Sequence, residues 1–444
     1  MKREISHEFT PLQLFSFSLP AIIMLLVSSL YTAVDGIFIA RYVGSDALSA
    51  INIMLPIDAL SYAVSIMFGT GASAIVGRKL GQGKKQEARE NFTLVTLVAL
   101  LTGIVLSVVL TAFFEPLVMR LGATERLMGY CMQYGYILFG GSVFTVIQVM
   151  YQALFITAGK SRLAMLLTTA SGVMNLVLDY VLIVPLQMGM AGAAWGTVAG
   201  RILGGVFPLI YFMKDRGMLA FSRPRWDGMV LLKTIGNGSS EMVSNLAIGV
   251  TTLLFNLAMI EIAGEDGVAA MTIVLYTQFV YTAVYLGFST SAAPVISFHY
   301  GKENWQYLRK LFRSCIGIIS MSTVCMLVAS IVFAKPLISL FTSPQTAVYE
   351  MAYSGYMLFI WNFLFAGFNI FSSALFTAFS NGAVSAFISF LRTLVFVVGA
   401  ILLLPALIGL NGIWLSIPTA EFLTFLVAVV VVKKYGDVPY HYLK

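Results

Sequence analysis

The chain has 444 residues, of which 59% are hydrophobic and only 11% are charged. Soluble domains contain about 45–50% apolar residues, so this composition excludes an ordinary water-soluble globule and predicts a polytopic membrane protein. The formal net charge is +7, and because the basic residues are spread over short loops, a nucleic-acid-binding surface is not expected.

Twelve apolar runs follow one another along the chain, separated by short polar breaks. Each run is long enough to cross a hydrocarbon core of about 30 Å as an α-helix, and backbone groups in lipid must be hydrogen-bonded within the segment. The sequence therefore predicts an all-α protein with twelve transmembrane helices. The predicted spans are residues 13–38, 47–77, 93–114, 129–158, 162–186, 190–213, 234–260, 268–298, 312–333, 350–379, 383–406 and 410–432.

Lysine and arginine gather in alternate breaks between the spans. Residues 77–90 and 214–233 carry five basic residues each, and residues 299–313 carry four. Cytoplasmic loops of membrane proteins are enriched in these residues. We therefore expect a multi-pass protein of the cell membrane with both termini in the cytoplasm.

The second half of the sequence matches the first half at one constant offset, which places Thr70 on Thr290 and Gly81 on Gly301. Such an offset over nearly the whole chain indicates two related halves of six spans each. Both halves begin on the cytoplasmic side, as in transporters that handle their substrate between parallel repeats. The predicted parts are an N-terminal lobe (1–213), a cytoplasmic linker (214–233) and a C-terminal lobe (234–444).

Two segments near the N-terminus carry a family resemblance. LPAIIMLLVSSLYTAVDGIFIARYVGSDALSAINI (19–53) and GTGASAIVGRKLGQGKKQEA (69–88) resemble the first two helices and the following loop of the multidrug and toxic compound extrusion (MATE) family. Asn175-x3-Asp179 and GMAGAAWGTVAGR (189–201) are similar to its fifth and sixth helices. The chain most resembles the prokaryotic branch of the MepA and DinF type. The resemblance implies cation-coupled efflux and two pseudo-symmetric six-helix bundles around a V-shaped central cleft.

Asp35 in the first span and Asp179 in the fifth are acids inside apolar runs. Charged groups in the membrane interior are costly and usually functional. Tyr31 and Asn175 each lie one helical turn before one of these acids, on the same face. Burial favours a neutral carboxyl group and a bound cation favours an ionised one, so such acids can exchange a proton or Na⁺. The alternatives are an interfacial acid at Asp35 and a hydrogen-bonded structural acid at Asp179.

The resemblance implies a protonation or sodium site in the N-terminal lobe, which carries over to Asp35, Asn175, Asp179 and Thr197. Tyrosines near that site in the family correspond to Tyr31 and to Tyr134 or Tyr136. The sequence shows no metal-ligand cluster and no catalytic constellation, so we expect no catalytic residue, no cofactor besides the coupling H⁺ or Na⁺, and no other metal. Some members carry acids deep in the seventh and tenth helices. Residues 242–260 and 351–379 contain none, so a C-terminal coupling site of that kind is not expected.

Other polar residues in the spans have two interpretations each. Asp58 is either functional or has a helix-end or packing role. Glu241 is either a cleft-facing substrate contact or an acid at the start of a helix. Arg201 and Glu421 occupy equivalent positions in the two halves. They could form an ion pair that joins the halves, and a structural role is favoured for such a pair. Gln148 and Gln152 are expected to join helices.

The C-terminal half is rich in methionine and aromatic residues, which suit varied apolar cations. Candidate cleft residues are Met242, Phe255, Met259, Tyr276 and Phe279, although helix packing explains any single one better. The leading interpretation is a monomeric H⁺- or Na⁺-coupled antiporter in the lipid bilayer that exports amphipathic, often cationic aromatic drugs and dyes by alternating access.

Two other functions remain open as alternatives. A flippase for lipid-linked precursors would need a more cationic cleft, and Arg201 and Arg392 are the only candidates in helix interiors. An intramembrane lipid-modifying enzyme would need clustered acids, a catalytic histidine or a Ser–Lys pair, which the sequence lacks, so the protein is not expected to be an enzyme.

Overall fold

The computed structural model describes residues 5–121, 123–214, 217–339 and 341–435. Within these ranges nearly every residue is helical. The elements are α1 (Pro11–Tyr42), α2 (Ser45–Gly81), α3 (Lys85–Ala112), α4 (Phe114–Arg120), α5 (Glu125–Gly140), α6 (Ser142–Thr157), α7 (Ser161–Ile183), α8 (Gly189–Lys214), α9 (Gly228–Gly301), α10 (Trp305–Ser339), α11 (Ala347–Phe359), η1 (Ile360–Asn362), α12 (Phe363–Ala378), α13 (Gly382–Phe390), η2 (Leu391–Val395), α14 (Phe396–Ile408) and α15 (Leu410–Tyr435).

The helical segments overlap the predicted spans, but α9 begins at Gly228, inside the predicted linker at 214–233. In the described ranges eleven segments are long and apolar enough to cross a membrane, and α5 with α6, bent by 53°, makes a twelfth. The long helix α9 counts as two spans because it turns at Gly264, where the backbone φ is 64°. The predicted all-α membrane fold with twelve spans is therefore confirmed.

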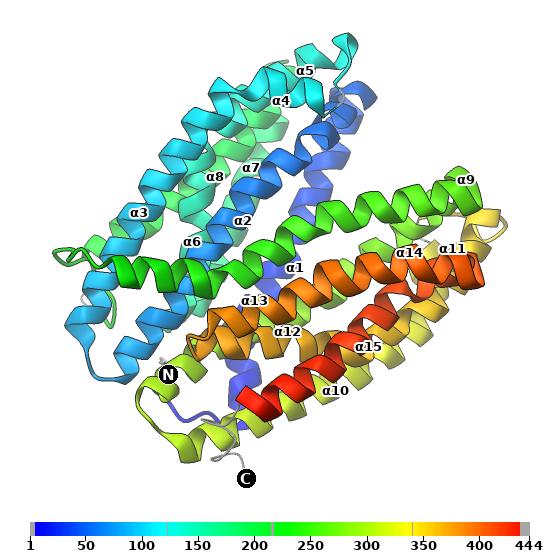
Figure 1. Ribbon diagram of the computed structural model, residues 1–444. Coiled ribbons are helices and arrows are strands. Elements are labelled where there is room, and N and C mark those ends of the chain that lie inside the picture. The colour runs from blue at the N-terminus through cyan, green and yellow to red at the C-terminus, as the bar shows by residue number, and fades with distance from the viewer. Residues whose placement is uncertain (1–4, 122, 215–216, 340, 436–444) are drawn as a thin grey trace.

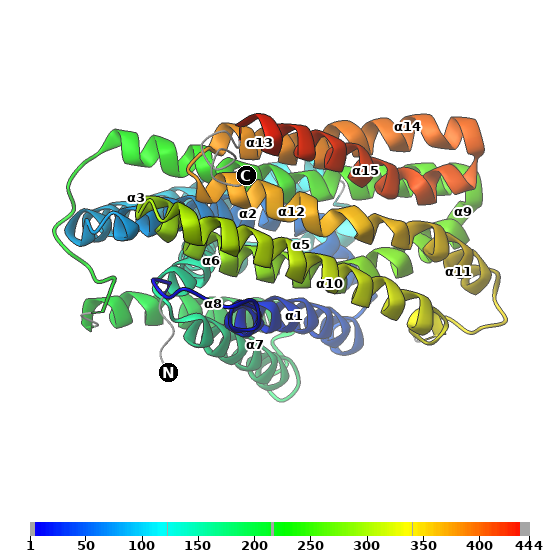
Figure 2. The same ribbon diagram turned by 90° about the horizontal axis from the view of Figure 1, so that it is seen from below.

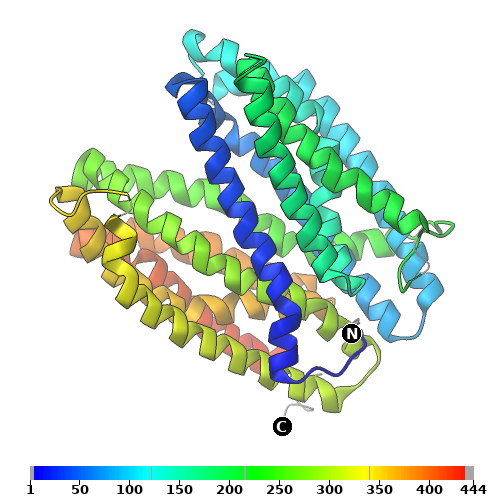
Figure 3. The ribbon, with the colours of Figure 1, turned by 180° about the vertical axis from the view of Figure 1, so that it is seen from behind.

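The helices form two groups that meet at one end and diverge at the other (Figure 1). We call α1–α8 the N-terminal lobe and α9–α15 the C-terminal lobe. The described ends of the chain lie near the end where the lobes meet. Seen from behind, α1 runs along the junction (Figure 3), and it contacts both α7 and α9. Seen from below, α1 and α7 lie at one face of the molecule and α14 and α15 at the other (Figure 2).

The internal repeat is visible in the backbone. Gly44 and Gly264, which are equivalent in the repeat, both have positive φ and link the first two spans of each lobe. Gly189 and Gly409, a second equivalent pair, have φ values of 55° and 59°. This backbone conformation is open to glycine at little cost, so both halves retain glycine where the chain must turn between the same spans.

The lobes touch through backbone contacts between α2 and α9. A Cβ atom added to Gly81 would lie 1.8 Å from the Phe298 carbonyl oxygen, and one added to Gly301 would lie 2.0 Å from the Arg78 carbonyl oxygen. The two contacts are equivalent, since the offset of the repeat places Gly81 on Gly301 and Arg78 on Phe298. Small residues allow helix backbones to approach this closely.

We expect Gly301→Val to weaken the contact between the lobes. The new side chain would meet backbone atoms, which cannot move aside as a flexible side chain can, and overpacking of this kind costs about 1–3 kcal/mol. Thermal unfolding in detergent measures the effect. Gly317→Val is the matched control, because a Cβ atom at Gly317 meets nothing within 4 Å. Equal unfolding midpoints for the two variants would contradict the assigned contact.

Candidate functional site

The two intramembrane aspartates lie side by side. Asp35 on α1 and Asp179 on α7 interact through their side chains. Asp179 is 0% exposed. Both of its carboxyl oxygens and the Oδ1 of Asp35 are buried without a hydrogen-bond partner at normal geometry among the described residues, and the Asn175 amide interacts with the Asp179 carboxyl group. Two adjacent carboxylates repel each other when both are ionised, so the pair can share a proton or hold a cation.

Glycines on α8 allow the fifth and sixth spans to close over this pair. A Cβ atom at Gly196 would lie 2.1 Å from Oδ1 of Asp179, and one at Gly200 would lie 2.7 Å from the Ser171 carbonyl oxygen. Gly192, Gly196 and Gly200 recur at every fourth position and therefore share one helical face. The sequence of α8 thus provides the close helix packing that removes Asp179 from solvent.

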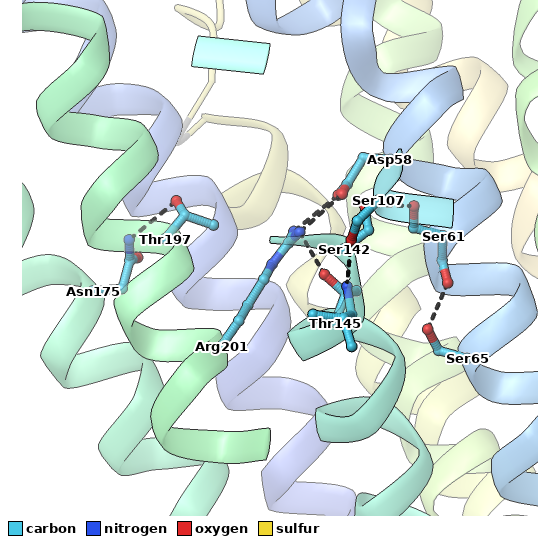
Figure 4. Close-up of polar contacts among 10 residues, drawn as sticks. Asp58, Ser61, Ser65, Ser107, Ser142, Thr145, Asn175, Thr197 and Arg201 are labelled. Carbon is cyan, nitrogen blue, oxygen red and sulfur yellow. Dashed lines mark hydrogen bonds and ion pairs between the residues drawn. The ribbon is translucent and has the colours of Figure 1, made fainter. Parts of the chain in front are cut away.

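Asn175 and Thr197 lie beside the aspartates. The Asn175 amide donates to the Thr197 hydroxyl at 3.3 Å (Figure 4). The buried Tyr134 hydroxyl interacts with Thr197 and with the charge of Asp35. The structure therefore brings the four carried-over residues together with Tyr134, from α1, α5, α7 and α8.

The other two candidate tyrosines differ in their surroundings. The ring of Tyr31 packs close to Gly172 of α7, where a Cβ atom would lie 2.9 Å from Tyr31 Cδ1. Tyr136 is 41% exposed, and its ring centroid lies 5.3 Å from that of Phe114. Of the two alternatives left open by the sequence, Tyr134 is therefore the one that lies next to the aspartates.

Arg201 forms an ion pair within the N-terminal lobe. Its Nη1 and Nη2 atoms donate to the two carboxylate oxygens of Asp58, at 3.0 Å each, and Nη1 also donates to Thr145 at 2.8 Å (Figure 4). The suggested pairing of Arg201 with Glu421 is therefore wrong. The positive charge of Arg201 also acts on Asp35, so the pair contributes to the electrostatics of the aspartate site.

Glu421 has its own partners in the C-terminal lobe. Arg392, on the π-helical turn η2, donates to Glu421 at 2.8 Å, and the Asn369 amide donates to its other carboxylate oxygen at 2.6 Å. Glu421 is 4% exposed. The repeat offset placed Arg201 and Glu421 at equivalent positions, but equivalent residues of a repeat each face neighbours in their own lobe. Sequence analysis did not find Asn369, and for Arg392 the only signal was a basic residue inside an apolar span.

The suggested cleft residues do not form one surface. Phe255 and Met259 are 1% and 0% exposed inside a core cluster of the C-terminal lobe, so the structure does not support them as ligand contacts. Met242 is partly buried against the main core. Tyr276 and Phe279 are exposed, and Tyr276 stacks on Phe341 at 6.1 Å between ring centroids.

Glu241 is not at the start of a helix, because α9 begins at Gly228. It lines a cavity between the lobes. The interpretation as a helix-start acid is therefore wrong. Tyr62 of α2, which sequence analysis did not select, interacts electrostatically with Tyr31, Asp58 and Glu241.

Comparison with known proteins gives consistent matches along the whole chain. The profile of the MatE family matches residues 20–181 and 242–402. The multidrug export protein MepA of Staphylococcus aureus (strain MRSA252) is 24% identical over 422 residues, which covers 94% of this chain and 92% of the relative. MepA of Staphylococcus saprophyticus is 24% identical, with 97% and 96% covered.

Solved structures share the same fold. A multidrug resistance MATE family transporter of the MOP superfamily, in its outward-facing conformation, is similar with a TM-score of 0.91 at 22% identity, and 98% of each chain is covered. A MATE protein in complex with MaL6 gives a TM-score of 0.92 at 21% identity, again with 98% of each chain covered.

Proposed function

The chain belongs to the MatE family, and from this premise we propose that it is a secondary multidrug exporter. It exchanges H⁺ or Na⁺ for amphipathic, often cationic aromatic compounds and moves them out of the cell. Relatives that span nearly the whole chain are multidrug export proteins. The observation that carries the proposal is the buried contact between Asp35 and Asp179, in which Oδ1 of Asp35 and both carboxyl oxygens of Asp179 have no hydrogen-bond partner at normal geometry among the described residues.

We propose that this aspartate pair is the coupling site. A buried carboxylate pair is stabilised by a proton or a cation, and it loses that ligand when its surroundings change. Asn175 and Thr197 supply neutral oxygens that suit a hard cation. Because α1 contacts α7 as well as α9 of the other lobe, a change in occupancy at Asp35 can act on the contact between the lobes.

We also propose that the protein lies in the cell membrane with both termini in the cytoplasm. The support is the excess of lysine and arginine in the breaks at 77–90 and 299–313. In this orientation the lobes meet on the cytoplasmic side and diverge outward (Figure 1), which is an outward-facing arrangement. Substrate would then be released from between the lobes to the outside.

The flippase alternative has less support from the structure. It would need free basic groups between the helices to bind a lipid phosphate. The two interior arginines named as candidates, Arg201 and Arg392, are bound to Asp58 and Glu421 at 3.0 Å and 2.8 Å. An interior arginine that is already paired is a poor partner for a phosphate.

Everted membrane vesicles test the exporter function. We expect vesicles that contain the protein to take up ethidium or norfloxacin when a Na⁺ or a proton gradient is imposed, one gradient at a time, and vesicles without the protein to take up neither. The gradient that drives uptake identifies the coupling ion. Binding of a polyprenyl-linked precursor, with no affinity for dyes, would contradict the proposal in favour of the flippase.

A further inference from the structure

A cavity lies between the two lobes, away from the paired aspartates. Its walls come from α2 and α6 of the N-terminal lobe and from α9 and α12 of the C-terminal lobe. One acid, Glu241, and the hydroxyl-bearing residues Thr70, Ser73, Ser289, Thr290 and Thr377 line it. No aromatic side chain is among the lining residues, so the cavity lacks the surface on which a planar drug would stack.

Equivalent residues of the two halves of the repeat line the cavity from both lobes. Thr70 and Thr290 are equivalent in the repeat and both line it, one from each lobe. Glu241 breaks this symmetry, because the equivalent position in the first half is Ala21. The site therefore has paired neutral oxygens from the two lobes and a negative charge from one of them.

Two of the hydroxyl oxygens in the cavity have lone pairs available to a cation. The Ser289 side chain is 3% exposed, and its hydroxyl has no hydrogen-bond partner among the described residues. The Thr70 hydroxyl uses its one hydrogen to donate to the Ile66 carbonyl at 2.8 Å, which leaves its lone pairs available. The charge of Arg392 acts on Glu241, but its guanidinium is bound to Glu421 at 2.8 Å.

We propose that this cavity is a second cation site, shared by the lobes, that binds Na⁺ through the Glu241 carboxylate and the hydroxyls of Thr70, Ser289 and Thr290. Hard cations prefer such oxygen ligands. Since the ligands come from both lobes, bound Na⁺ stabilises the arrangement in which α2 touches α9. A ligand that binds one arrangement better than another shifts the population toward it, so Na⁺ here holds the lobes together at the end near the chain termini.

Thermal unfolding of the purified protein in detergent tests Na⁺ binding. Choline chloride is replaced by NaCl or KCl at constant ionic strength. The measurements are made on the Asp179→Asn variant, so that the aspartate pair does not contribute to the effect of Na⁺ on the unfolding midpoint. In that background we expect the unfolding midpoint to rise with Na⁺ concentration, to rise less with K⁺, and to lose its Na⁺ dependence when Glu241→Gln is added. Thr290→Val and Ser289→Ala are expected to weaken the Na⁺ dependence of the unfolding midpoint. These two variants replace Glu241→Gln in the test if that variant does not fold.

Three results would overturn the proposal. One is a midpoint in the Asp179→Asn background that does not respond to Na⁺. Another is a Na⁺ response that Glu241→Gln leaves unchanged. The third is a Glu241-dependent response to ethidium with none to Na⁺, which would make the cavity a substrate contact. None of these results bears on gradient-driven efflux by the wild-type protein, so the proposed function is tested separately.

Distances between spin labels test the effect of Na⁺ on the lobes. Gln82 and Lys302 are exposed at the ends of α2 and α9 and are equivalent in the repeat. In the Asp179→Asn background, we expect Na⁺ to increase the population with a short distance between labels at these positions. Adding Glu241→Gln should abolish the response. A distance distribution that does not change with Na⁺, or a response that survives the Glu241 change, would contradict a role in holding the lobes together.

Discussion

Asp179→Asn is expected to reduce gradient-driven efflux by more than about tenfold while the protein remains folded, and Asp35→Asn is expected to do the same. Asparagine keeps the shape of the side chain but cannot exchange a proton, and it holds a cation poorly. An ion that crosses a 100 mV potential contributes about 2.3 kcal/mol per charge. Loss of the exchanging group uncouples that energy from the movement of the lobes.

Efflux assays in everted vesicles, combined with thermal unfolding in detergent, separate uncoupling from misfolding. Asp46→Asn is the matched control, since Asp46 is an acid of α2 that pairs at the surface with Arg126 at 2.7 Å, and surface ion pairs add little. We expect the control to transport like the wild type. If Asp35→Asn and Asp179→Asn both transport at wild-type rates, the aspartate pair is not the coupling site.

Arg392→Met is expected to destabilise the protein by about 3–5 kcal/mol, the usual cost of breaking a buried ion pair. The substitution leaves the Glu421 carboxylate, 4% exposed, with only the Asn369 amide as a side-chain donor in the described structure. Removal of both charges in Arg392→Met/Glu421→Gln should restore much of the loss, because no unpaired charge then remains.

The unfolding midpoint in detergent measures this effect. Expression at a reduced temperature allows the destabilised Arg392→Met variant to be purified. Arg126→Met serves as the control, because it also removes an arginine from an ion pair but at the surface, where Arg126 is 76% exposed. An unfolding midpoint for Arg392→Met equal to that of Arg126→Met would show that the buried pair does not stabilise the lobe.

The spans could be predicted from the sequence because hydropathy marks each helix that crosses lipid. The repeat could be predicted because turns such as Gly44 and Gly264 need glycine in both halves. The spacing of Asn175 and Asp179 placed both on one face of a helix. Their proximity to Asp35 came only from the family resemblance, because nothing within a single sequence says that α1 packs beside α7.

The partners of the interior arginines could not be predicted for the same reason. Arg201 faces Asp58, and Arg392 faces Glu421, because of how each helix is rotated within its lobe. Hydropathy is nearly uniform around these helices and carries little information about rotation. Phe255 and Met259 illustrate this limit, since a residue in the lobe core and one between the lobes have the same apolar character.

Transport by the purified protein in liposomes tests the exporter function most directly. Proteoliposomes loaded with a cation gradient should accumulate ethidium above its external concentration, and an ionophore that collapses the gradient should release it. The Asp179→Asn variant should show no accumulation under the same gradient. Accumulation that persists after the gradient is collapsed, or that is unaffected by Asp179→Asn, would contradict secondary transport coupled through the aspartate pair.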